Sequence, residues 1–138
     1  MRELDYLLQL RRDIGSIDVR LKELESMVYP QAMNISDMPR GSSRKNTLEE
    51  YIIKWDRLHL KRHRLEVDIL TRWAAMEKAF KEHGVTEAQQ AVMKYRFFCG
   101  HTWKRCVNYM RVEYPETVWD EQKLFRIYRK VLTKMARQ

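Results

Sequence analysis

The sequence predicts an all-α protein in which a long helical hairpin or coiled coil is followed by a bundle of shorter helices. Three observations support this fold class. The 138 residues include only 4 Gly and 3 Pro, too few for the many turns of an all-β fold. Apolar residues recur at intervals of three and four over long stretches, which is the period of an amphipathic helix. Two long periodic segments are followed by several short ones, so rods are expected before the bundle.

Residues 1–29 are predicted to form one helix with a heptad seam. Its apolar residues are Leu7, Leu10, Ile14, Ile17, Leu21, Leu24 and Val28, and Leu4 extends the seam backwards. Their alternating spacing of three and four is typical of a helix that pairs with one or two others. The pattern fits an ordinary core helix and a dimerising coiled coil equally well. Gly15 either allows another helix to cross closely or is a weak point in the helix.

Residues 30–46 are predicted to be a linker, because Pro30 should end the first helix and the segment is rich in Pro, Gly and Ser. Its basic residues are Arg40, Arg44 and Lys45. They are expected to be solvated, with contact to phosphates as the alternative.

Residues 47–83 are predicted to form a long central helix. Thr47 and Glu50 have the spacing of a capping box, and Gly84 is a natural stop. One face carries Tyr51, Trp55, Leu58, Leu65, Ile69, Trp73, Met76 and Phe80, with Arg62 at the skipped position. His59 and His63 are four residues apart, but the basic residues around them oppose a bound cation, so no metal is expected.

Residues 84–138 are predicted to form the last domain, entered through a capped turn at Val85 or Thr86. A helical run from Gln90 to Phe98 breaks at Cys99 and Gly100, and the chain restarts at His101. A second break around Tyr114 and Pro115 precedes the final helix, for which Thr117 is the expected cap, with Asp120 in the first turn. A short helix, a break and a longer cationic helix follow the order of a helix-turn-helix.

The positive charge of the chain is concentrated in this last domain. Residues 94–138 hold 11 Lys or Arg and 4 Asp or Glu, whereas residues 1–93 hold 16 and 15. Nearly all of the formal net charge of +8 therefore lies in the last third. This concentration of positive charge favours a polyanionic partner, because each phosphate that the protein neutralises releases counterions.

The last fifty residues also resemble a known group of proteins. The segments concerned are Tyr95-Arg96-Phe97-Phe98, Thr102-Trp103-Lys104-Arg105-Cys106-Val107 and Phe125-Arg126-Ile127-Tyr128-Arg129-Lys130-Val131-Leu132. They are similar to the helix-turn-helix of sigma factor region 4, and more closely to the ArpU and RinA type of late-gene regulators of phages and prophages. The resemblance implies a phage or prophage protein, located in the cytoplasm of the bacterial host cell, that binds duplex DNA at a promoter and activates phage late genes through contact with host RNA polymerase. The turn at 111–116 is longer here than in that group.

The final helix supplies most of the expected DNA-binding residues. Its apolar stripe of Leu124, Ile127, Val131 and Met135 should face the core. Gln122, Lys123 and Arg126 are then expected near bases, because the amino-terminal residues of a recognition helix reach deepest. Arg129, Lys130, Lys104 and Arg105 are expected at phosphates. The aromatic residues Trp103, Tyr95, Phe97, Phe98 and Phe125 are expected in the core rather than stacked on bases.

The favoured function is a DNA-binding transcriptional regulator, dimeric through its amino-terminal helices. A small terminase subunit that recognises DNA for packaging is one alternative, and a helical adaptor or inhibitor that binds protein is another. No enzyme is expected, because no phosphate loop, Cys-x-x-Cys pair or catalytic grouping is present, and no cofactor is expected either. The apolar stretches are too short for a membrane span, and Cys99 and Cys106 suit a reducing compartment.

Overall fold

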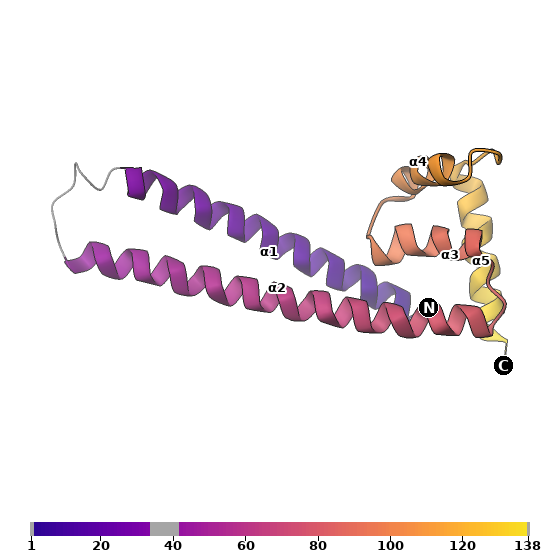
Figure 1. Ribbon diagram of the computed structural model, residues 1–138, viewed down its shortest axis with the longest axis horizontal. Coiled ribbons are helices and arrows are strands. Elements are labelled where there is room, and N and C mark those ends of the chain that lie inside the picture. The colour runs from indigo at the N-terminus through magenta and orange to yellow at the C-terminus, as the bar shows by residue number, and fades with distance from the viewer. Residues whose placement is uncertain (1, 34–41, 138) are drawn as a thin grey trace. The chain divides into compact units, whose positions relative to one another are not determined.

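The computed structural model describes residues 2–33 and 42–137. Over these residues the helices are α1 (Arg2–Met33), α2 (Ser42–Glu82), α3 (Glu87–Met93), the π-helical segment η1 (Lys94–Phe98), α4 (Trp103–Glu113) and α5 (Glu121–Ala136). None of the described residues lies in a strand, so the all-α prediction is confirmed (Figure 1).

The chain divides into two compact units, and each long helix contributes one part to each of them. Unit 1 comprises Met1–Arg11 and Asp68–Gln138, and unit 2 comprises Arg12–Val67. Unit 1 is therefore larger than the domain expected to begin at residue 84, because it also includes the start of α1 and the second half of α2.

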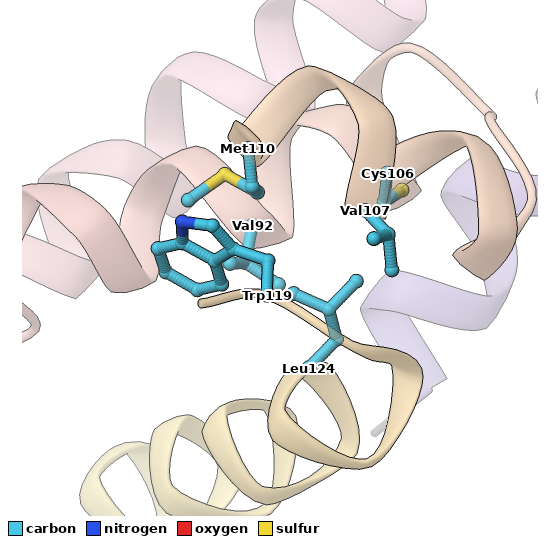
Figure 2. Packing of buried hydrophobic residues seen from close by; sticks show 6 residues of the cluster. All are labelled: Val92, Cys106, Val107, Met110, Trp119 and Leu124. Atoms are coloured by element: carbon cyan, nitrogen blue, oxygen red, sulfur yellow. The ribbon is translucent and has the colours of Figure 1, made fainter. Parts of the chain in front are cut away.

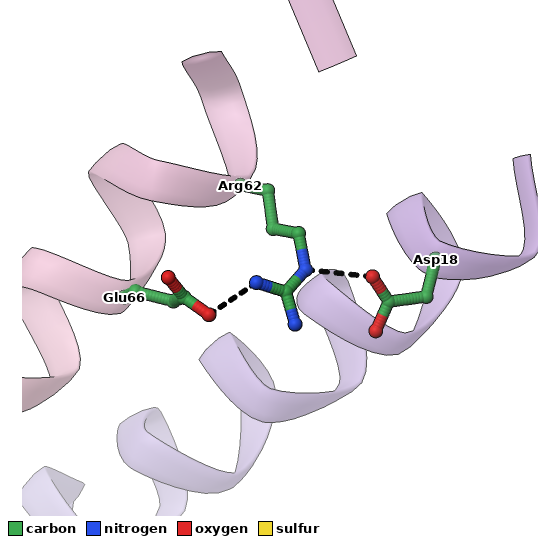
Figure 3. Close-up of polar contacts among 3 residues, drawn as sticks. All are labelled: Asp18, Arg62 and Glu66. Carbon is green, nitrogen blue, oxygen red and sulfur yellow. Dashed lines mark hydrogen bonds and ion pairs between the residues drawn. The ribbon is translucent and has the colours of Figure 1, made fainter. Parts of the chain in front are cut away.

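In unit 2 the heptad seam of α1 is covered by α2 of the same chain. Ile14, Ile17 and Leu21 are all buried. Beside them Arg62 of α2 occupies the skipped position of its apolar face, where its Nε donates to a carboxylate oxygen of Asp18 over 2.6 Å and its Nη1 donates to Glu66 (Figure 3). The hydrogen bond with Asp18 raises the pKa of Arg62 further above its usual value. This part of the seam is thus filled within the chain and is not free to pair with a second copy.

The ends of the two long helices differ from the sequence prediction. α1 continues through Pro30 to Met33, because the fixed φ of proline is compatible with a helix, although its missing N–H costs the helix one backbone hydrogen bond. α2 begins at Ser42, so Thr47 lies inside the helix and does not cap it. Residues 34–41 of the expected linker, including Arg40, lie outside the described residues, as do the side chains of Arg44 and Lys45.

Unit 1 has a core to which both long helices contribute. Its buried residues from these helices are Leu4, Leu7, Leu10, Ile69, Trp73, Met76 and Phe80. The Trp73 ring lies 5.7 Å from the ring of Phe80 and 5.5 Å from that of Phe98, which joins α2 to η1. Arg72 pairs with Glu3 over 2.9 Å, and this contact fixes the start of α1 against α2.

The connection from α2 to α4 is built from two glycine turns and one capping box. Gly84 ends α2 with a φ of 72°, and Gly100 ends η1 with a φ of 75°. Thr86 caps α3 through the backbone N–H of Gln89, whose side chain accepts from the backbone N–H of Thr86. The expected caps and breaks at these positions are confirmed. At Gly100 an added Cβ would lie 3.2 Å from Cγ of Arg11, so that side chain would have to shift to admit a larger residue.

Candidate nucleic-acid interface

α5 is held in unit 1 by its apolar face. Leu124 and Val131 are buried, and Leu124 joins a core cluster with Val92 of α3 and Cys106, Val107 and Met110 of α4 (Figure 2). Ile127 packs against the same cluster, so the expected apolar stripe does face the core. In Figure 1 α5 runs across α3 and α4 rather than alongside them.

The first turn of α5 is capped by Asp120, whose carboxylate accepts from the backbone N–H of Lys123 over 2.7 Å. The expectation that Thr117 is the cap is therefore wrong. Both residues have a suitable side-chain oxygen, but α5 begins only at Glu121, and Asp120 is the residue directly before it. A carboxylate at this end also interacts favourably with the helix dipole.

The long turn between α4 and α5 is fixed by Trp119, which is 4% exposed and completes the core cluster in Figure 2. Its indole N–H donates to the backbone oxygen of Tyr114 over 3.0 Å. Arg111 of α4 donates in turn to the backbone oxygen of Trp119 over 3.2 Å. The turn is thus held by the buried ring and the backbone of Trp119, which lies two residues before α5 begins.

The far end of α5 is tied to the turn that follows α2. The Nζ of Lys134 donates to the backbone oxygen of Gly84 over 3.0 Å and to the side-chain oxygen of Gln89 over 2.9 Å. Lys134 therefore has a positioning role that sequence reasoning missed, because its partners lie some fifty residues earlier in the chain.

The outward side of α5 is cationic. Gln122, Arg126, Arg129 and Lys130 are all exposed. Their spacings of three and four residues place them on one side of the helix. From Gln122 to Arg137 the sequence contains no acidic residue. The structure therefore brings together four of the seven residues expected to bind DNA, on one exposed surface of one helix.

Lys123 differs from these four residues. It is half-buried, and its Nζ lies 4.9 Å from the ring centroid of Trp119, within the range of a cation–π contact. The ammonium group of Lys123 therefore interacts partly with Trp119 in the turn before α5. Among the residues expected near bases, Gln122 and Arg126 are the better exposed.

Lys104 and Arg105 lie exposed in the first turn of α4, after the cap residue Thr102. Thr102 accepts from the backbone N–H of Arg105 over 3.3 Å, as expected for a helix start at this position. Near them, the pKa of His101 is lowered by burial and then by the charges of Arg105 and Arg11.

The aromatic residues of unit 1 form a cluster that only partly matches the expected core. Phe97 is buried, and Trp103, Tyr95 and Phe98 are half-buried. Phe125 is 40% exposed, so its assignment to the core is wrong. On α5 it lies beside the outward face rather than the apolar stripe, and its ring centroid lies 5.0 Å from that of Trp103.

The two cysteines are not poised for chemistry at neutral pH. Burial raises the pKa of Cys106 to about 11, and burial also raises the pKa of Cys99. Both thiols therefore stay protonated. Within residues 2–33 and 42–137, no three His, Cys, Asp or Glu side chains are grouped so as to hold a metal ion. Among the same residues, no helix combines the length and apolar character that crossing a membrane requires.

Comparison with known proteins gives no further assignment. No protein-family model, no curated protein and no solved structure matches the chain.

Proposed function

We propose that this protein is a DNA-binding transcriptional regulator that reads duplex DNA with α5. The observation that carries the proposal is the exposed face formed by Gln122, Arg126, Arg129 and Lys130 on a helix whose other side is buried. A rigid helix with one cationic face is the element that helix-turn-helix proteins place in the major groove. The concentration of positive charge in residues 94–138 supports the same partner.

Some side chains on this face are suited to contact bases, and others are suited to contact phosphates. Arg126 can bond a guanine through two N–H groups, and Gln122 can bond an adenine in a similar way. Arg129 and Lys130, one turn further along, are better suited to phosphates, as are Lys104 and Arg105. Lys123 takes a smaller part in base reading, because its ammonium is drawn toward Trp119.

Within this class, the resemblance to the ArpU and RinA type supports a finer proposal. The protein would act in the cytoplasm of a bacterial host, at a late promoter of a phage or prophage, and would contact host RNA polymerase. A homodimer on DNA is part of the proposal. Since residues 14–21 of α1 are covered by α2 of the same chain, the dimer must use another surface.

The proposal is tested by measuring the affinity of the full chain for a preferred duplex and a scrambled one by fluorescence anisotropy. Arg126→Ala should reduce the difference between the two duplexes by about 1–3 kcal/mol, because a base contact is lost. Lys130→Ala should weaken both alike and lower the slope of log affinity against log salt by about 0.9.

Lys78→Ala is the matched control, since Lys78 is an exposed lysine of α2 in the same unit. It should leave both affinities nearly unchanged. Equal affinity of the wild-type chain for all duplexes would contradict the proposal. So would a loss of binding in the control as large as in the α5 variants.

A further inference from the structure

The part of α2 that belongs to unit 2 buries little of its apolar surface. None of its side chains between residues 47 and 67 is buried, whereas Ile14, Ile17 and Leu21 of α1 are all under 8% exposed. Ile52, Ile53 and Leu60 of α2 each leave about half of their surface exposed. Since a pair of helices can cover only the side on which they meet, unit 2 has apolar surface left for a partner.

A groove between α1 and α2 in unit 2 has the size and lining of a binding site. Its volume is about 370 Å³, and its lining is mainly apolar. Leu24 and Met27 of α1 and Leu58 of α2 supply apolar side chains, and Arg20, Glu23, Lys54 and Arg57 supply charged ones. Three cations against one carboxylate give the groove a positive rim. Met27 is 51% exposed, and its flexible thioether can adapt to different side chains.

The positive rim continues along α2. Lys54, Arg57, Lys61 and Arg64 are all exposed, and their spacings of three, four and three residues place them in one row. The row extends over roughly 15 Å at 1.5 Å per residue, which is about three helical turns. A partner that fits both features has apolar side chains for the groove and carboxylates for the row.

We propose that this groove binds an acidic amphipathic helix of a partner protein. Its apolar residues, at intervals of three and four, would lie on Leu24, Met27 and Leu58, and its carboxylates would face the row that begins at Lys54 and Arg57. This is the helix-in-groove mode of recognition, with charge complementarity setting the register.

Other occupants fit the groove less well. Duplex DNA would neutralise the row but would leave the apolar lining without a partner. A second copy of this chain would bring two positive rows together across an isologous contact, which opposes association. A membrane surface needs apolar residues on a convex face, whereas Leu24 and Leu58 are half-buried in a groove.

The test is a selection of random peptides of about 16 residues, displayed on phage and captured by the full chain; as helices they would span roughly 24 Å. The double variant Lys54→Glu with Arg57→Glu serves as counter-selection. The retained peptides should be rich in Asp and Glu, with apolar residues three and four apart. Met27→Glu and the double variant should each lower the affinity for a synthetic selected peptide by about tenfold or more, equivalent to 1.4 kcal/mol.

Two variants are matched controls on α1 outside the groove. Val19→Glu introduces the same charge as Met27→Glu at another exposed apolar residue, and Lys22→Glu reverses an exposed lysine. Both should keep the wild-type affinity, and circular dichroism should show all variants folded. Met27→Glu keeps the test decisive if the double variant does not fold.

Three results would overturn the proposal. One is a pool of retained peptides that is not acidic, or no enrichment at all. Another is peptide binding that the groove variants do not weaken. The third is that the same variants weaken binding to a short duplex, to phosphatidylglycerol vesicles or to a second copy of the chain, while no peptide binds. The inference does not depend on DNA binding by α5, and peptide binding by an Arg126→Ala chain keeps the two proposals separate.

Discussion

The indole N–H of Trp119 donates a hydrogen bond to the backbone oxygen of Tyr114 over 3.0 Å, and this contact closes the turn between α4 and α5. The same oxygen accepts the backbone N–H of Thr117 over 3.3 Å. A turn that would otherwise be loose is therefore anchored to the core by one side chain. The direction in which α5 presents its cationic face depends on that anchor.

Trp119→Ala should destabilise the protein by about 3–5 kcal/mol, because it removes a buried ring and leaves a cavity in the core cluster of unit 1. Urea unfolding followed by circular dichroism measures the change. The adjacent Val118 is 83% exposed, so Val118→Ala should change the free energy of unfolding by no more than about 0.5 kcal/mol. Similar losses in both variants would show that Trp119 does not anchor the turn.

Replacing each of two glycines by alanine should change the free energy of unfolding in opposite directions. Gly100→Ala should cost about 1–2 kcal/mol, because the residue has a φ of 75° and the new methyl group would crowd Arg11. Gly15→Ala should stabilise the protein by about 0.5–1 kcal/mol, because no atom lies within 4 Å of the added Cβ and alanine favours the helix. Thermal unfolding compares the two. A destabilising Gly15→Ala would reveal a helix that crosses α1 closely.

Lys134→Met should destabilise the protein by about 1 kcal/mol, since it removes the two hydrogen bonds from Nζ to Gly84 and Gln89. The methionine keeps the apolar stem in place. Lys78→Met, at an exposed lysine of α2, is the control and should leave stability within about 0.5 kcal/mol of wild type. Equal effects at the two lysines would indicate that the contact with the α2–α3 turn contributes nothing.

The hydroxyl group of Tyr95 should lose its proton at a higher pH than an ordinary tyrosine does. Its hydroxyl donates a hydrogen bond to the carboxylate of Glu113, and this bond, with burial, raises the pKa of Tyr95 to about 12. A raised folded-state pKa means that the stabilisation is fully present below about pH 10, the usual value, and is lost as pH rises toward 12. The difference in tyrosinate absorbance between wild type and Tyr95→Phe isolates this group during an alkaline titration.

Because the carboxylate of Glu113 is the main cause of the raised pKa of Tyr95, Glu113→Gln should lower the titration midpoint of Tyr95 toward 10. Glu116→Gln, at an exposed carboxylate of the following turn, should leave it in place. A wild-type midpoint already near 10 would exclude the hydrogen bond with Glu113 in solution.

The sequence predicted the features that depend on local patterns. The seam from Leu7 to Leu21, the cap at Thr86 and the stops at Gly84 and Gly100 each follow from residue type and spacing. The start of α2 at Ser42 was missed, because a polar segment with proline, glycine and serine favours a linker and says nothing of how far a neighbouring helix extends.

Long-range contacts explain what else the sequence left open. Lys134 meets Gly84 across fifty residues, and Trp119 packs into a cluster with residues of three helices. No local pattern predicts such pairings. The exposed residues of α5 could be predicted only because Leu124, Ile127 and Val131 fix which side of the helix is buried.

Whether the outward face of α5 reads DNA is tested by sequencing the duplexes that the purified full chain retains from a random pool. We expect one short enriched motif, and its loss from the pool retained by the double variant Gln122→Ala with Arg126→Ala, two exposed residues on that face. A pool that stays random after selection by the wild-type chain would exclude base reading by α5.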